Sequence, residues 1–264
     1  MSDRSRRNLI TLSVMGFLIP EVVWATPKNA RPLADGPRVA ADPVAISSGL
    51  SARWQAAMAR DLGWSADFSP QESGSVLDML NQGQTDVGLF LSHPKADDLD
   101  KQGLIYERHA LASTDVLLVG PSADLAGIRS ETDAGRALTQ VIVAASAGQA
   151  RWTPPPSNSA LAALADSLTK GLASKGMNGG GAPSKSVSGP AYQLMTRASM
   201  TKGGLPAGTK IWALPDPRMS LQLQAALSFR SHHAAGKLLV TWLQWPMAQS
   251  IVNKSQPAWR KLKA

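Results

Sequence analysis

The sequence predicts an α/β fold in which an open sheet is flanked by helices. Short apolar runs bounded by turn residues alternate with longer segments in which apolar residues recur every three or four positions. The chain has 264 residues, which is enough for one large domain or for two lobes. Alternating strand and helix patterns of this kind are typical of an open α/β sheet.

The first half of the chain predicts three strands and two helices. We expect strands at residues 38–41, around Phe68 and at residues 86–91, the last of which stops at a His-Pro pair. A helix is expected at residues 49–62, with an apolar face made of Leu50, Trp54, Ala57, Met58 and Leu62. Ser73-Gly74-Ser75 should open a second helix that continues through Leu80, with Ser75 as its N-cap.

The second half continues the alternation around one irregular segment. We expect strands at residues 116–119, 141–144 and 221–229, and helices at residues 159–172 and 234–244. The strand at 221–229 alternates apolar and polar residues, so one of its faces should be wet. Residues 173–190 are rich in Gly, Ser, Lys and Pro and are expected to form a mobile loop.

The N-terminus has the layout of a cleavable export signal. Arg4, Arg6 and Arg7 precede an apolar run at residues 9–19 that is shorter than the roughly 20 residues needed to cross a bilayer. Small or modest side chains before Thr26 predict cleavage after Ala25, so the mature chain should be periplasmic and not embedded in the membrane. The paired arginines leave two export routes open, the twin-arginine pathway and the general secretory pathway.

Composition excludes several classes of function. The expected signal removes three of 27 basic and two of 19 acidic residues, which leaves a net charge of +7 on the mature chain. The sequence contains no block of five or six basic residues, so a solvated basic surface is favoured over nucleic-acid binding. The absence of cysteine excludes disulfides, thiolate nucleophiles, cysteine-ligated zinc and a lipidated N-terminal cysteine.

No enzyme class is supported by the motifs. The four histidines are His93, His109, His232 and His233, and none has the spacing of a zinc site. The sequence also lacks a Gly-x-Ser-x-Gly elbow and a phosphate-binding P-loop. We therefore expect no catalytic residue, metal site or cofactor, a packing role for His93, and a solvated turn at His232-His233.

Several motifs, in order along the chain, resemble those of the periplasmic tungstate-binding proteins of ABC transporters. They are Pro37-Arg38-Val39-Ala40 with Ser48-Gly49-Leu50, the segments at residues 86–94 and 107–128, Ala191-Tyr192-Gln193-Leu194-Met195-Thr196-Arg197, Asp216-Pro217-Arg218, and the tail from Lys237 through Gln249. The resemblance implies the type II periplasmic-binding-protein-like fold, in which two α/β lobes hold a ligand in the cleft between them. After the expected signal peptide at 1–25 and a linker at 26–37, it implies lobe I at 38–120 and 216–264 and lobe II at 121–215.

The resemblance also directs attention to helix starts at the cleft. Free N–H groups and the positive dipole end of a helix can bind an oxyanion without a full positive charge. The candidates are Ser47 and Ser48 before the first helix and Ser73, Gly74 and Ser75 at the second. Ordinary helix capping is the alternative role of these residues. Further candidates at the implied cleft are Thr114, Ser146, Arg151 and Arg197.

Three departures from the family pattern bear on the ligand, and one is that the loop at residues 175–188 replaces the helix expected before the Ala-Tyr motif. A hydroxyl-rich run of the family falls on Ala41-Asp42-Pro43-Val44, so Asp42 would repel an oxyanion if it faced the cleft. The family's arginine falls near Ser146, and Arg151 is the nearest replacement by position. The implied function is a monomeric receptor that delivers an oxyanion of the tungstate or molybdate type to an ABC permease. The alternatives are a changed specificity for a neutral or cationic solute, and a sensor without transport.

Overall fold

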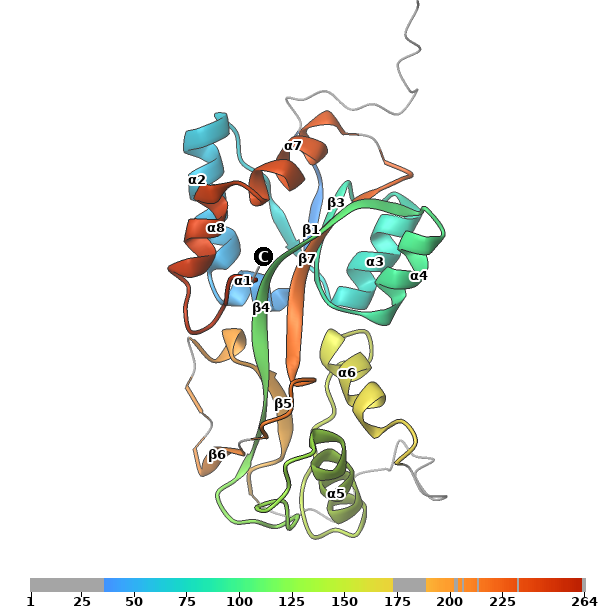
Figure 1. Cartoon of the computed structure of the whole chain (residues 1–264), viewed down its shortest axis with the longest axis vertical. Coiled ribbons are helices and arrows are strands. Elements are labelled where there is room, and N and C mark those ends of the chain that lie inside the picture. The colour runs from blue at the N-terminus through green and yellow to red at the C-terminus, as the bar shows by residue number, and fades with distance from the viewer. Residues whose placement is uncertain are drawn as a thin grey trace, which may run out of the picture.

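Two long strands, β4 (Ile105–Pro121) and β7 (Ser220–Ser228), run along the molecule and connect its upper and lower parts (Figure 1). The computed structural model describes residues 36–172, 189–201, 204–205, 207–212, 214–231 and 233–262. Within these residues, seven strands form a sheet with the order β2-β1-β3-β7-β4-β5, and β6 also pairs with β4. Helices flank the sheet, so the predicted α/β class is confirmed.

Three short parallel strands form one side of the upper sheet. β1 (Val39–Ala41) lies between β2 (Phe68–Pro70) and β3 (Val87–Leu91). Parallel strands require crossover connections. These contain α1 (Pro43–Ser47) and α2 (Leu50–Leu62) before β2, and α3 (Ser73–Gln82) before β3. The carboxyl ends of all three strands therefore lie at the same edge, facing the lower part of the molecule (Figure 1).

Helices cover both faces of the upper sheet (Figure 1). α3 and α4 (Pro94–Lys101) pack on one face over a small core that includes Leu80 and Phe90. α2, α7 (Ala234–Leu243) and α8 (Pro246–Asn253) cover the other face. Three tryptophans, Trp54, Trp242 and Trp259, are fully buried in the core on that side. Because their side chains are 0% exposed, Trp242 and Trp259 pack in the core and present no ring face to a ligand.

β4 (Ile105–Pro121) and β7 (Ser220–Ser228) are the segments that cross between the two parts. β4 pairs with β7 from Ile105 to Asp115 and with β5 (Gln193–Thr196) and β6 (Thr209–Trp212) from Val116 onward. The lower part also contains α5 (Ala134–Ser146), α6 (Ala160–Thr169) and the short η2 (Ala198–Thr201). The expected lobe boundaries at 120 and 216 remain a prediction.

The strand expected at residues 141–144 is wrong, because this run belongs to α5. Four consecutive apolar residues fit either a buried strand or a buried helix segment. The buried positions decide the question: Ala134, Ala137, Leu138, Val141 and Ala144 recur at helical spacing, while Val143 is 52% exposed. A strand would have buried alternate residues or all of them.

Four local expectations also need correction. The solvated turn expected at His232-His233 is wrong for His233, which is buried at 6% exposure and occupies the N-cap position of α7. α3 begins at Ser73 rather than after an N-cap at Ser75, and Glu72 occupies the cap position without a side-chain cap hydrogen bond. β7 is not wet on one face along its whole length, because Gln224, Ala226 and Ser228 are buried beside α3 and β4. Leu238 does not belong to the buried stripe of α7, since it is 38% exposed.

The other predicted elements are confirmed within a few residues, although β4 is much longer than the strand expected at 116–119. The signal at 1–25, residues 26–35, most of the 173–190 loop and His232 lie outside the described residues. Of the helices in the described part of the chain, none is long and apolar enough to span a membrane.

Candidate functional site

Three helices begin where the parallel strands end. β1 leads into α1, β2 into α3 and β3 into α4, so three helix N-termini gather at the carboxyl edge of the sheet. Ligands of open α/β sheets bind at this edge, because the free N–H groups of the first helical turn point outward there. The residues at this edge are therefore the candidate site.

Ser73 links these strand ends. Its side chain is fully buried, and its hydroxyl donates to the Asp42 carboxylate at 2.5 Å. The same hydroxyl accepts from the backbone N–H of Leu91 at 2.9 Å. Asp42 also caps α1 by accepting from the N–H of Val44 at 2.9 Å, and it is only 2% exposed. Asp42 and Ser73 therefore hold the end of β1, the end of β3 and the start of α3 together.

Two carboxyl groups lie at this edge: that of Asp42, which is buried, and that of Glu72, which is partly buried. Burial raises the pKa of the Asp42 carboxyl above its ordinary value, and the hydrogen bonds from Ser73 and Val44 oppose this increase. Burial also raises the pKa of Glu72, and the neighbouring charge of Asp42 adds to that effect. The edge thus combines helix N-termini, which favour anions, with two carboxyl groups, which disfavour them.

The first amides of α3 face a segment from the lower part of the molecule. The N–H of Gly74 donates to the backbone carbonyl of Asn158 at 2.8 Å. The Asn158 amide group lies 3.4 Å from the Ser75 hydroxyl, to which it donates. Asn158 immediately precedes Ser159, the N-cap of α6. The N-termini of α3 and α6 therefore meet at Asn158, which sequence reasoning did not single out.

Gly74 is required for this close approach. A Cβ atom at position 74 would lie 2.8 Å from the Asn158 carbonyl oxygen and 3.4 Å from His93 Nε2. Contacts below 3.0 Å force neighbouring atoms to shift, and the nearer neighbour here is backbone. A side chain at this position would separate α3 from the segment that carries Asn158.

His93 lies at the same edge with a defined orientation. Its Nδ1 accepts from the N–H of Lys95 at 3.2 Å, which caps α4. In the neutral ring the proton is then on Nε2, on the side of Gly74. Burial lowers the pKa of His93, the charge of Lys95 lowers it further, and Asp78 opposes both effects. The sequence predicted only a packing role for this residue.

The two serines before α2, Ser47 and Ser48, differ in their exposure to solvent. Ser47 ends α1 and is exposed. Ser48 is buried, donates to the carbonyl of Ala45 at 3.2 Å and accepts from Trp259 Nε1 at 2.9 Å. The hydroxyl of Ser48 therefore serves the packing of the core in this conformation.

The remaining predicted residues have local partners. Thr114 is buried and accepts from the N–H of Ala198 at 3.2 Å, while Arg197 donates to the Asp115 carboxylate at 3.2 Å. Arg151 donates to the carbonyl of Gly189 at 2.9 Å. Ser146 is exposed at the end of α5, where it donates to Ile142. The structure thus brings Asp42, Ser73, Gly74 and Ser75 together, and no hydrogen bond joins Arg151 or Ser146 to them among the described residues.

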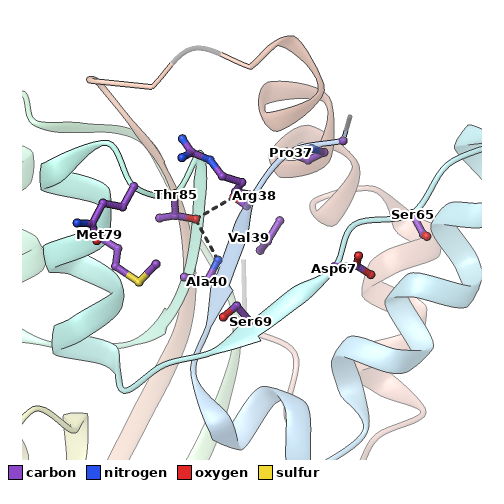
Figure 2. A pocket seen from close by; sticks show the side chains of 11 residues that line it. Pro37, Arg38, Val39, Ala40, Ser65, Asp67, Ser69, Met79 and Thr85 are labelled. Carbon is purple, nitrogen blue, oxygen red and sulfur yellow. Dashed lines mark hydrogen bonds between the residues drawn. The ribbon is translucent and has the colours of Figure 1, made fainter. Parts of the chain in front are cut away.

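Two cavities lie outside the carboxyl edge. One, of about 370 Å³, opens at the amino end of β1 and β2, between Arg38, Asp67, Met79 and their neighbours (Figure 2). The Thr85 hydroxyl in its wall donates to the carbonyl of Arg38 at 2.8 Å and accepts from the N–H of Ala40 at 3.1 Å. The other, of about 420 Å³, lies beside α8. No predicted site residue lines either cavity.

A metal centre receives no support from side-chain clustering. Across the part of the chain that the structure describes, no three His, Asp or Glu side chains come close enough together to hold a metal ion.

Comparisons with known proteins agree with this fold. The family model "Bacterial extracellular solute-binding protein" matches residues 39–255. The structure of the tungstate-binding protein TupA from Desulfovibrio alaskensis G20 is similar with a TM-score of 0.62 at 19% identity, covering 86% of this chain and 99% of that one. The structure of the tungstate ABC transporter from Geobacter sulfurreducens is similar with a TM-score of 0.63 at 19% identity, covering 83% of this chain and 97% of that one.

A third solved structure is related in the same way. The periplasmic molybdate-binding protein of Azotobacter vinelandii is similar with a TM-score of 0.55 at 15% identity, covering 86% of this chain and 100% of that one. A comparison with curated proteins found no match. Identities this low establish the fold alone. The family model covers most of the chain, and the chain therefore belongs to the family of bacterial extracellular solute-binding proteins.

Proposed function

We propose that this protein is the periplasmic receptor of an ABC uptake system and that its solute is an oxyanion of the tungstate or molybdate type. The observation that carries the proposal is the hydrogen bond from the N–H of Gly74 to the Asn158 carbonyl. An oxygen atom from the chain itself already accepts a hydrogen bond at the start of α3. A solute oxygen would make the same contact.

The chemistry of the α3 N-terminus suits such a ligand. The first-turn amides of a helix have no partner within the helix, and their dipoles favour negative charge. The Ser75 hydroxyl lies beside these amides and can donate to an anion. His93 can supply a neutral Nε2–H donor from α4. Tungstate and molybdate binding by proteins of similar fold supports the same class of solute.

A second candidate is a neutral or cationic solute. It is favoured by Asp42 and Glu72, whose carboxyl groups lie at the same edge. Asp42 is engaged by Ser73 and Val44, so Glu72 is the carboxyl group with more freedom to pair with a cation. A cationic ligand would lower the pKa of Glu72, whereas an oxyanion would raise it further.

Calorimetry on the mature chain separates the two candidates. Titrations with tungstate, molybdate, divalent cations and basic amino acids should show heat only for the oxyanions. Saturation at 100 times the dissociation constant should add about 2.7 kcal/mol to the free energy of unfolding. Binding of a cation or a neutral solute, without oxyanion binding, contradicts the proposal.

A matched pair of variants locates the site. Ser75→Ala removes a hydroxyl at the α3 N-terminus, and loss of a hydrogen bond to a charged ligand should weaken tungstate binding about tenfold to a hundredfold. Ser157→Ala is the control, because Ser157 is exposed and no hydrogen bond of its side chain is found. Equal affinities for both variants would place the solute elsewhere.

Delivery to a permease is tested in the native host. Deletion of the coding sequence should reduce oxyanion uptake, and the wild-type protein should restore it. Unchanged uptake, together with oxyanion binding by the purified protein, would favour a sensor without transport.

A further inference from the structure

The segment that carries Asn158 is stiff. Residues 153–159 include Pro154, Pro155 and Pro156, and each proline ring restricts its backbone φ angle. At the start of this segment, the N–H of Thr153 donates to the carbonyl of Tyr192 at 2.9 Å. At its other end, which we call the tip, the N–H and the hydroxyl of Ser159 both donate to the carbonyl of Pro156, at 2.9 and 2.7 Å. We call residues 153–159 the proline finger.

The tip of the proline finger touches α3 mainly through polar contacts. Asn158 accepts from Gly74 and donates to Ser75, yet Asn158 as a residue is exposed. The two hydrogen bonds of the tip are therefore made by a residue that remains accessible to water. A contact of this kind forms when the finger is positioned by its own stiffness, and it separates at small cost when a better acceptor arrives.

We propose that the proline finger closes the α3 N-terminus and that the Asn158 carbonyl competes with the solute for the Gly74 amide. This inference rests on the proposed function, because it concerns the same site. A backbone N–H donates well to only one acceptor along its axis. The Asn158 carbonyl and a solute oxygen therefore exclude each other at Gly74.

Competition has a measurable consequence for affinity. Only molecules in which the finger has withdrawn can bind solute, so the apparent dissociation constant is the intrinsic one divided by the open fraction. For a contact of one net hydrogen bond, the closed finger should weaken apparent binding about two- to tenfold. Replacing the prolines with more flexible residues should therefore increase the apparent affinity for solute. If the segment were purely structural, the same substitutions would lower that affinity or leave it unchanged.

The first test is a cross-link. The chain contains no cysteine, so Ser75→Cys with Asn158→Cys introduces a single pair where the side chains now approach to 3.4 Å. We expect rapid intramolecular cross-linking without solute, by oxidation or with a short thiol cross-linker, and at least fivefold slower cross-linking in saturating tungstate. The cross-linked protein should not bind tungstate, and reduction of the disulfide formed by oxidation should restore the affinity that the double variant had before oxidation.

The matched control moves one cysteine by a single residue. Ser75→Cys with Ser157→Cys should cross-link more slowly, because among the described residues the hydrogen bond to Ser75 comes from the Asn158 side chain and none comes from Ser157. Equal rates for the two pairs would show that the finger does not rest on α3 as proposed. Unchanged tungstate affinity after cross-linking, or cross-linking that tungstate does not slow, would overturn the competition.

The second test leaves α3 untouched. Replacing Pro154, Pro155 and Pro156 together with alanine should lower the apparent dissociation constant for tungstate about two- to tenfold and speed hydrogen exchange at the Gly74 amide without solute. An unchanged or higher constant overturns the proposal. If the wild type binds neither tungstate nor molybdate, the proposed function fails and competition with oxyanions fails with it. The cross-linking rates, which need no solute, still show whether the finger closes α3.

Discussion

Replacing Ser73 with alanine should be far more costly than replacing its neighbour Ser75, although both lie in the first turn of α3. The Ser73 hydroxyl donates to the Asp42 carboxylate at 2.5 Å and accepts from the N–H of Leu91 at 2.9 Å, and all three groups are buried. A hydrogen bond to a charged group contributes about 1.5 to 3 kcal/mol, and an unpaired buried N–H costs about 1 to 3 kcal/mol. We expect Ser73→Ala to lower the free energy of unfolding by about 3 to 5 kcal/mol.

The loss should also depend on pH. Without the Ser73 hydroxyl, the pKa of Asp42 in the folded state should rise further above its unfolded value of 3.8. A raised folded-state pKa gives stability that is present below pH 3.8 and is lost as the pH rises through the folded-state value. The difference between wild type and Ser73→Ala should therefore be larger at pH 7 than at pH 4.

Urea denaturation at the two pH values measures both effects, with Ser75→Ala as the matched control. The Ser75 hydroxyl accepts only a long hydrogen bond of 3.4 Å, so its loss should change stability by no more than about 0.5 kcal/mol. Similar losses for Ser73→Ala and Ser75→Ala, or a loss for Ser73→Ala that does not vary with pH, would refute the assigned role of the buried hydroxyl.

Three further predictions concern other parts of the chain. Trp54→Ala should cost about 3 to 5 kcal/mol in thermal or urea unfolding, whereas Trp245→Ala, at a side chain that is 45% exposed, should cost less than about 0.5 kcal/mol. Arg218 lowers the pKa of Asp216, so their pairing adds stability above pH 3.8 that is lost at lower pH. Arg218→Ala should lower the free energy of unfolding more at pH 7 than at pH 3, and an equal loss at both would exclude the ion pair. N-terminal sequencing of the exported protein should begin near Thr26, and intact precursor in the cytoplasm would contradict export.

The elements that the sequence predicted well are those in which burial follows a simple pattern along the chain. β3 is buried on every side, so a continuous apolar run was sufficient to place it. α2 packs one face on the core, and its apolar residues repeat at helical spacing. Residues 141–144 failed because the run is too short to show a period, and the deciding residues lie one turn earlier in α5.

The candidate site was predictable only in part. The hydroxyl-rich start of α3 was visible as Ser73-Gly74-Ser75, but the sequence could not show that Ser73 faces inward while Ser75 faces Asn158. Asn158 was missed because its main contact is a backbone carbonyl, which carries no residue-type signal. The three prolines before it were the only available indication that the segment is held in one shape.

Asp42 shows why the loss of a hydroxyl-rich run does not translate directly into a changed ligand. Its carboxylate accepts from Val44 and Ser73, so it is part of the connection between β1, α1 and α3. The raised pKa of Asp42 means that a negative charge there is already disfavoured, and an oxyanion bound at Gly74 would disfavour it further. Uptake of a proton at Asp42 would then relieve the repulsion that the sequence alone suggests. Charge at this edge therefore depends on Asp42, which lies behind the start of α3, as well as on the N–H donors of the first turn of α3.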